Sequence, residues 1–350
     1  FTVTFSEAVT GFEDSDVALG GTAGATTAVV SGSGTTYDVA VSGMTVNGTV
    51  TASVADGAAQ DEALNTSEAS TSADNLVNYV VGPVDVTVEQ AAAQLDPTNA
   101  LPVNFTVTFS RPINLGSFTS NDLTLGGDAP GTPAAAITEI APNDGTTFNA
   151  AVNGLTGSGT VTVSLAANTV QDTAGNDNSA STSADNTVSY DIAQPGVTVS
   201  STAADPTNVS PIPVTITFDE AVTGFTPSSA SGDLVITNGT DSNPAGSGTT
   251  YTFDLTPSGQ GAVTVRIPAA SGQDGAGNAN TESNTFSITY DSVRPTVTIE
   301  QAAAQADPTN ISPIHFTVTF SEAVTGFEDS DVTLGGTAGA TTAVVSGSGT

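Results

Sequence analysis

Hydrophobic and polar residues alternate one by one along many short stretches of the chain. In residues 105–109, for example, two threonines alternate with Phe105, Val107 and Phe109. The same period-two pattern occurs at residues 214–218, 251–255, 263–267, 286–290 and 316–320. Because successive side chains of a β-strand point to opposite faces, each stretch is predicted to be a strand with one buried face.

Clusters of Gly, Pro, Asn and Asp separate these strands at intervals of about 8 to 15 residues, so about seven strands fit into each 100 residues. Seven short antiparallel strands in that length are typical of a two-sheet sandwich of the immunoglobulin (Ig) type. The Cys and Trp residues that mark antibody domains are absent from this chain. The pattern therefore predicts an all-β fold of Ig-like β-sandwich domains.

Two kinds of internal repeat divide the chain. Residues 1–35 recur at 316–350 with one difference, Ala18 against Thr333. Within this long period, a D-P-T-N string begins at Asp96, Asp205 and Asp307, and a D-x-x-x-N string begins at Asp61, Asp172 and Asp274. Spacings of 102 to 111 residues between them correspond to one domain each.

These spacings predict four Ig-like repeats. Residues 1–81 are interpreted as a repeat lacking its first strand, 82–193 and 194–291 as complete repeats, and 292–350 as a repeat truncated at its C-terminal side. The near-identity of the first and last segments favours the interpretation that this sequence is part of a longer array of repeats.

The string VTIEQAAAQADPTNISPIHFTVTFSEAVTGF at residues 297–327, the loops QDTAGN and QDGAGN, and a strand ending in Tyr-Asp resemble the bacterial Ig-like repeats of large secreted and surface-attached proteins, including adhesins. The resemblance implies tandem Ig-like β-sandwich domains in an elongated array. It also implies an extracellular or cell-surface location, a stalk or matrix role, and in many cases calcium between domains.

Charge and composition exclude several classes of function. The chain has 36 acidic residues, three arginines and no lysine, with a net charge of −33. Such a field repels nucleic acid and anionic membranes, and no apolar run approaches the roughly 20 residues of a membrane-spanning helix. The one histidine, His315, precedes a predicted strand and is expected on its surface, and there is no cysteine nucleophile. We therefore expect no catalytic activity.

Acidic residues are expected to meet where one repeat follows another. If the strands alternate in direction, the Asp after the last strand of one repeat lies near the end of the second strand and the D-x-x-x-N loop of the next. For the second and third repeats this predicts a group of Asp191, Glu220, Asp274 and Asn278, with Asp219 as a further candidate. The matching residues elsewhere are Asp291 and Glu322 at the following junction, and Glu7 and Asp61 in the first repeat.

Converging carboxylates repel unless a cation neutralises them, and calcium takes six to eight oxygen ligands. Calcium is therefore the expected cofactor. The alternative is that these residues are solvated loop carboxylates that never converge.

The junction of the first two repeats departs from this pattern. Arg111 stands where the other repeats have Glu, and Val80 stands where they have Asp. We expect Arg111 to pair with Asp172 or Asp177 and so to replace an ion. The alternative is a solvated arginine in a divergent loop.

Two functions are compatible with these features. One is a passive spacer that holds a distant module away from a cell, with neighbouring repeats of the same chain as its partners. The other is a self-assembling filament or matrix in which strand exchange joins different chains. A ligand-binding module on the loops is a third class, and its surface ligand is unknown.

Overall fold

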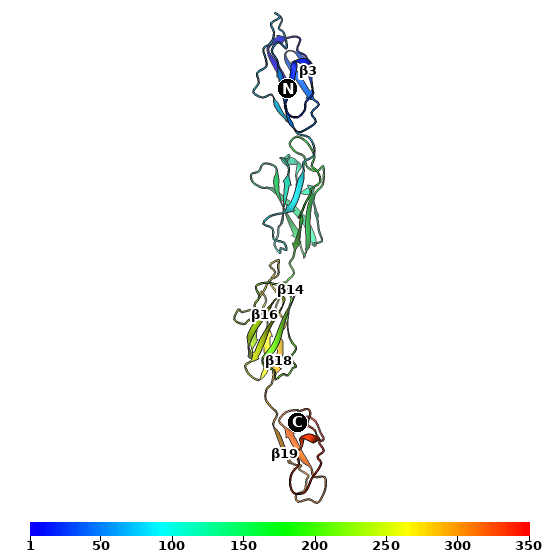
Figure 1. Ribbon diagram of the computed structural model, residues 1–350, viewed down its shortest axis with the longest axis vertical. Coiled ribbons are helices and arrows are strands. Elements are labelled where there is room, and N and C mark those ends of the chain that lie inside the picture. Colours follow the sequence, from blue (N-terminus) through cyan, green and yellow to red (C-terminus); the bar gives the residue numbers. More distant parts are fainter. The chain divides into compact units, whose positions relative to one another are not determined.

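The computed structural model describes residues 1–350 and consists of β-strands joined by loops and four short 3₁₀ helices (Figure 1). The chain folds into two compact units. The first comprises residues 1–194 together with 274–278, and the second comprises residues 195–273 and 279–350. No helix has the length and apolar character needed to cross a membrane.

The second repeat, in the first unit, is a complete two-sheet sandwich. Its strands are β6 (Val86–Gln90), β7 (Val103–Phe109), β8 (Leu123–Gly126), β9 (Gly131–Glu139), β10 (Thr147–Leu155), β11 (Gly159–Leu165) and β12 (Thr187–Tyr190), with η2 (Leu115–Ser117) and η3 (Ser120–Asp122) before β8. One sheet has the order β6-β7-β10-β9 and the other has the order β12-β11-β8. With the seven strands lettered A to G, these are the ABED and GFC sheets of an Ig domain, which confirms the predicted fold class.

Alternation along β7 explains why this sandwich forms. Val103, Phe105, Val107 and Phe109 are each at most 2% exposed and belong to one core. The intervening threonines lie on the outer face of the sheet, where a β-branched residue suits the pleated backbone. The ring of Phe109 meets Phe118 and Phe148 edge-to-face, with centroids 5.2 and 5.9 Å away.

The first repeat contains β1 (Thr2–Val9), η1 (Asp14–Asp16), β2 (Val17–Gly20), β3 (Thr27–Ser42), β4 (Gly48–Val54) and β5 (Leu76–Tyr79). Its sheets are β1-β3 and β2-β4-β5, so β1 pairs on one side only. An aromatic trio equivalent to that of the second repeat, Phe5, Phe12 and Tyr37, lies at its core.

The third repeat lies mostly in the second unit. Its strands are β13 (Val197–Ser201), β14 (Ile212–Val222), β15 (Val235–Thr237), β16 (Gly239–Pro257), β17 (Gly261–Arg266) and β18 (Phe286–Tyr290). The sheets β13-β14-β16 and β15-β17-β18 keep the order of the second repeat. The long strand β16 occupies the place of both β9 and β10, and Tyr251, Phe253 and Leu255 along it are buried as their alternation predicts.

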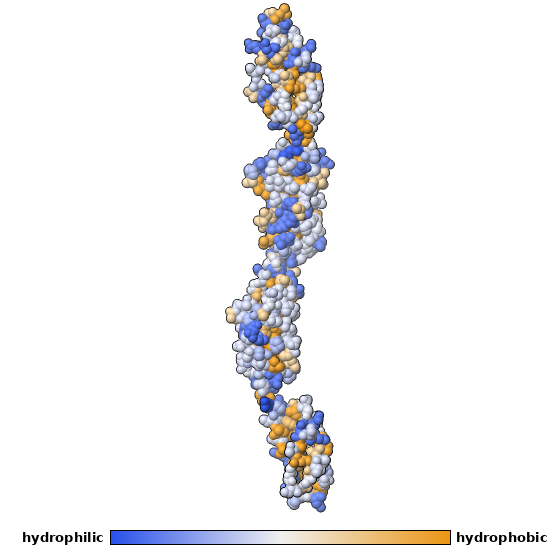
Figure 2. All heavy atoms as spheres, in the orientation of Figure 1, coloured by the Kyte–Doolittle hydropathy of each residue, from blue (hydrophilic) through white to orange (hydrophobic).

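The fourth repeat has only the paired strands β19 (Val297–Gln301) and β20 (Phe316–Phe320), followed by η4 (Asp329–Asp331). Apolar side chains of this pair are exposed, and Figure 2 shows hydrophobic residues at the surface of this repeat. Phe316 is 59% exposed, whereas Phe105, at the same position of the second repeat, is fully buried.

The D-P-T-N turn fastens the last strand of each complete repeat. The Thr98 amide donates to Ser189 O at 2.9 Å, and the Asp191 amide donates to Thr98 O at 2.8 Å. Thr207 makes the same two bonds in the third repeat, with Thr289 and Asp291, at 2.9 and 2.8 Å. These bonds place Asp191 and Asp291 directly after a fixed strand end.

Candidate metal centre and its arginine-paired counterpart

Each D-x-x-x-N loop is closed by the same pair of hydrogen bonds. The aspartate accepts from the backbone amide and from the side-chain amide of the asparagine four residues later. These two distances are 2.9 and 2.7 Å for Asp61–Asn65, 2.8 and 2.9 Å for Asp172–Asn176, and 2.8 and 2.8 Å for Asp274–Asn278. The loop therefore holds its own aspartate carboxylate in a fixed position in all three repeats.

In the second repeat this aspartate pairs with arginine. Arg111 Nε donates to Asp172 Oδ2 at 2.7 Å, and Arg111 Nη2 donates to Gly82 O at 2.5 Å. The Asp172 side chain is 3% exposed and that of Arg111 is 23% exposed. Asp177 accepts instead from Gln171 Nε2 at 2.9 Å. The predicted ion pair is thus confirmed, with Asp172 as the partner.

The electrostatics of Asp172 follow from these contacts. Burial by itself would raise the pKa of its carboxyl group. Hydrogen bonds from the Asn176 side chain and backbone, and from Arg111, favour the charged form and lower the pKa to about 2. The pair is therefore ionised over the whole neutral and mildly acidic range.

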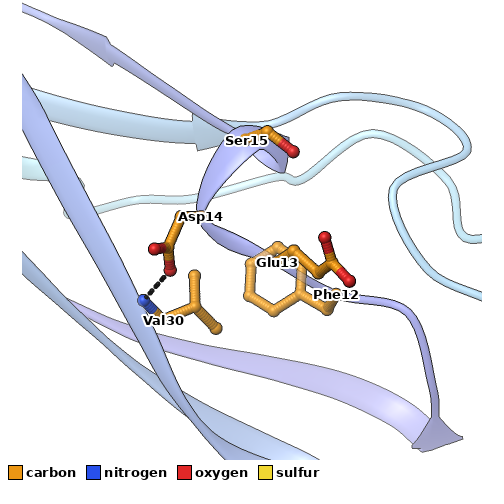
Figure 3. Close-up of a pocket in the computed structure, with 5 residues that line it drawn as sticks. All are labelled: Phe12, Glu13, Asp14, Ser15 and Val30. Carbon is orange, nitrogen blue, oxygen red and sulfur yellow. Dashed lines mark hydrogen bonds between the residues drawn. The ribbon is translucent and has the colours of Figure 1, made fainter.

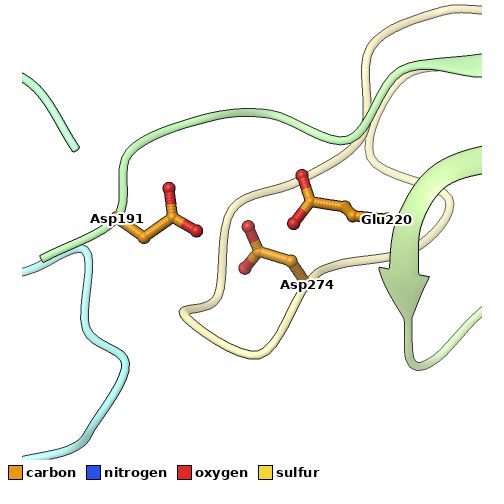
Figure 4. A group of neighbouring side chains, drawn as sticks. All are labelled: Asp191, Glu220 and Asp274. Atoms are coloured by element: carbon orange, nitrogen blue, oxygen red, sulfur yellow. The ribbon is translucent and has the colours of Figure 1, made fainter. Parts of the chain in front are cut away.

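In the third repeat, acidic side chains take the place of this pair. Carboxylate oxygens of Asp191, Glu220 and Asp274 lie within 4.8 Å of one another (Figure 4). Asp274, from the closed loop, is buried, and the other two are half-buried. Glu220 is at the end of β14, and Asp191 precedes β13. These are three of the residues for which the sequence predicts convergence.

Local hydrogen bonds also orient Asp191. Its Oδ1 accepts from Ser158 Oγ and from the Ala193 amide, both at 2.9 Å. Its backbone oxygen accepts from Asn278 Nδ2 at 2.9 Å. In the second repeat, Asn176 Nδ2 donates in the same way to Val80 O at 3.2 Å. The loop asparagine thus binds the residue at the Asp191 position whether or not that residue is acidic.

The chemistry of this group suits calcium. Its donors are all oxygens, three of them on carboxylates, which is the ligand type that calcium takes. At calcium–oxygen distances of about 2.3–2.6 Å, two ligands of one ion can be at most about 5 Å apart, so the observed spacing is compatible with a shared ion. Three carboxylates at this spacing also repel one another strongly at low dielectric.

The other predicted ligands are arranged differently. Asn278 holds Asp274 through its amide, and its Oδ1 accepts from Asn99 Nδ2 at 3.1 Å. Asp291 accepts from the Val293 amide at 3.0 Å, Glu322 is half-buried, Glu7 is exposed, and Asp61 binds Asn65. None of these last four lies in a group of three or more potential ligands.

Two further acidic residues have structural roles. Asp219, next to Glu220, accepts from the Gly196 amide at 2.8 Å and so fixes the start of β13. An open hollow beside η1 is lined by Phe12, Glu13, Asp14, Ser15 and Val30 (Figure 3). There Asp14 Oδ1 accepts from the Val30 amide at 2.6 Å, which ties the 3₁₀ turn to β3.

The sequence pattern did not indicate Asn99, the last residue of the D-P-T-N string, as a contact of the D-x-x-x-N loop. The two strings recur together along the chain, and that recurrence is the signal that could have paired them.

The strand order and the recurring loops define an Ig-like repeat protein. Residues 191–290, from Asp191 to Tyr290, match the family model of the bacterial Ig-like domain. All three clustered carboxylates lie within these bounds.

Solved structures give two further similarities. One is the Escherichia coli adhesin FdeC, with 14% identity and a TM-score of 0.34, covering 82% of this chain and 86% of that one. The other is the N-terminal part of the bacterial S-layer protein SbsC, with 16% identity and a TM-score of 0.22, covering 59% of this chain and 44% of that one. A comparison with curated protein sequences gives no match.

Proposed function

We propose that this chain is a non-catalytic structural region of an extracellular or cell-surface protein. In this proposal it is a stalk or spacer of Ig-like repeats. Calcium bound by Asp191, Glu220 and Asp274 stiffens the chain where the third repeat begins. The observation that carries the proposal is the convergence of these carboxylates within a bacterial Ig-like domain.

The charge of the site supports a resident cation. The chain has three arginines in all, and two of them form ion pairs elsewhere, Arg111 with Asp172 and Arg266 with Glu282. Calcium would offset the mutual repulsion of the three carboxylates. It would also tie the segment at Asp191 to the loop at Asp274 and to the end of β14.

The recurring loops support a mechanical role over a catalytic one. In three repeats the loop aspartate accepts a hydrogen bond from the asparagine of the same loop. This bond fixes the position of the carboxylate. The arginine pair of the second repeat preserves that arrangement with a different charge. A spacer needs such a fixed loop in every repeat, whether an arginine or a metal ion neutralises the loop aspartate.

The test compares thermal unfolding in excess calcium and in chelator. We expect calcium to raise the melting temperature of the wild-type chain and to have much less effect on Glu220→Gln, which removes one ligand charge. Glu68→Gln, an exposed residue outside the group, controls for the change in net charge. Equal calcium shifts in the wild type and Glu220→Gln would contradict the proposal.

Self-assembly is the competing function, and imaging separates the two. Negative-stain images of the secreted protein in calcium should show single thin threads if it is a spacer. Uniform fibres wider than one chain would instead support a filament or matrix.

A further inference from the structure

The loop at residues 274–278 contacts a second element besides the acidic group. Although it belongs to the third repeat in sequence, it is part of the first compact unit. Asn99, the last residue of the D-P-T-N turn, donates from Nδ2 to Asn278 Oδ1 at 3.1 Å. Asn278 Nδ2 in turn donates to Asp191 O at 2.9 Å. One loop asparagine is therefore bound by two residues that close the second repeat.

The glycines of this loop make the close approach possible. A Cβ atom added at Gly275 would lie 3.6 Å from Pro97 Cγ, and one added at Gly277 would lie 3.5 Å from Asn99 Nδ2. A Cβ at either position would therefore already be in van der Waals contact with the D-P-T-N turn. The matching glycine of the second repeat, Gly175, has nothing within 4 Å of such a Cβ.

The first repeat shows that the loop itself does not require this glycine. Leu64 stands at the position of Gly277 and has φ 67°, in the same left-handed region as Gly277 at 93°. The Asp61–Asn65 hydrogen bonds form nonetheless. The absence of a side chain at residue 277 thus serves the contact with Asn99 more than the fold of the loop.

We propose that the D-P-T-N turn is a docking surface whose partner is the D-x-x-G-N loop of the following repeat. Asn99 is the residue that recognises the loop, through the amide of Asn278, and Pro97 provides an apolar wall beside Gly275. The contact uses neutral groups, and in this proposal it needs no metal ion. It does not depend on the calcium proposal.

Hydrogen exchange of the full chain in chelator tests this proposal. Three amides of the loop are hydrogen-bonded inside it: Asp274 to Asn278 O, Gly277 to Asp274 O, and Asn278 to Asp274 Oδ1. Their exchange reports how well the loop is held. Loss of one hydrogen bond in Asn99→Ala should speed exchange in residues 274–278 about threefold to tenfold.

Asn208→Ala is the matched control. Asn208 occupies the same position in the D-P-T-N turn of the third repeat, is exposed, and makes no side-chain hydrogen bond. If Asn99 served only to fold its own turn, each variant would alter only its own turn. The exchange rates of residues 274–278 would then be the same in both. Equal exchange of that loop in both variants would overturn the proposal.

A second pair of variants tests the same contact from the other side. Gly277→Leu copies Leu64 and should release Asn99, speeding exchange both at residues 96–99 and in the loop. Gly175→Leu imposes the same backbone strain on the loop of the second repeat and should leave residues 96–99 and 274–278 unchanged. An effect of Gly277→Leu confined to its own loop would also overturn the proposal. Because no calcium is present, these outcomes are independent of those for the metal site.

Discussion

Arg111 donates from Nε to Asp172 Oδ2 at 2.7 Å, and in the third repeat the residue at the Arg111 position is Glu220, close to Asp274. The two loops have the same internal hydrogen bonds, yet the groups that face them have opposite charges. In the second repeat the aspartate is neutralised by the protein itself. In the third it lies among carboxylates, and we propose that calcium neutralises them.

Removing the guanidinium should destabilise the second repeat. In Arg111→Gln the nearly buried Asp172 loses its charged partner, so we expect a loss of about 1 to 3 kcal/mol. Arg266→Gln, which breaks an exposed pair with Glu282, should cost under about 1 kcal/mol. Denaturant-dependent hydrogen exchange of residues 161–190 would measure the loss of stability in Arg111→Gln, and exchange of residues 263–290 would measure the loss in Arg266→Gln. Equal losses, or a smaller loss in Arg111→Gln, would contradict the prediction.

A calcium site should be transferable to the second repeat. The double variant Val80→Asp with Arg111→Glu places carboxylates at the positions of Asp191 and Glu220, beside the existing Asp172. We expect one more calcium ion to bind than in the wild type, as measured by titration calorimetry. Arg111→Glu alone provides only two of the three carboxylates and should bind this ion much more weakly. No gain in stoichiometry in the double variant would show that these three positions do not suffice.

Acid should weaken the second repeat through Asp172. Its pKa is lowered to about 2 in the folded chain, from 3.8 as the ordinary value. Its stabilising contribution is therefore complete above about pH 4 and is lost as pH falls through 2. The difference corresponds to about 2 kcal/mol. Asp172→Asn should flatten the pH dependence of stability in this window, and an unchanged acid profile would contradict the assignment.

A buried asparagine should be one of the most sensitive positions of the third repeat. Asn280 is 1% exposed; its Oδ1 accepts from the Gly272 amide, and its Nδ2 donates to Pro268 O and Thr281 O. Asn280→Ala leaves the Gly272 amide and Thr281 O without partners, while Pro268 O keeps its bond from Ser271 Oγ, and should cost about 3 kcal/mol. Exchange of residues 263–290 measures the loss, with the exposed Asn208→Ala as the control. A loss below about 1 kcal/mol would contradict this role.

The strands were predictable because their signal is local. Residues such as Phe105, Val107 and Phe109 alternate with threonine within a single strand, and their burial follows from that alternation. The convergence of Asp191, Glu220 and Asp274 was also predictable, since it depends only on the direction of each strand. The contact of Asn99 with Asn278 was not predicted. It joins residues 179 positions apart through neutral amides, so no charge pattern marks it, and the joint recurrence of the two strings is the one sequence signal that points to it.

The two near-identical segments show which features depend on near neighbours and which depend on distant partners. The 3₁₀ turns η1 and η4 have the same capping boxes, and the Asp14–Val30 bond at 2.6 Å recurs as Asp329–Val345. These features form within a short stretch of sequence. Strand β2 instead depends on its pairing with β4, and the corresponding residues 332–335, which differ from it by Thr333 in place of Ala18, form no strand.

The bonds of Thr98 to Ser189 and Asp191 have a consequence for a chain under tension. They join the D-P-T-N turn to the last strand in a parallel bridge, and Thr207 repeats the arrangement with Thr289 and Asp291. A force along β12 that pulls at Asp191 would load both bonds together in shear, whereas a hairpin pulled open at its free end breaks its bonds one at a time. Each complete repeat thus has a pair of bonds that resists shear where the chain leaves it, and in the second repeat one of these bonds is made by Asp191, a residue proposed to hold calcium.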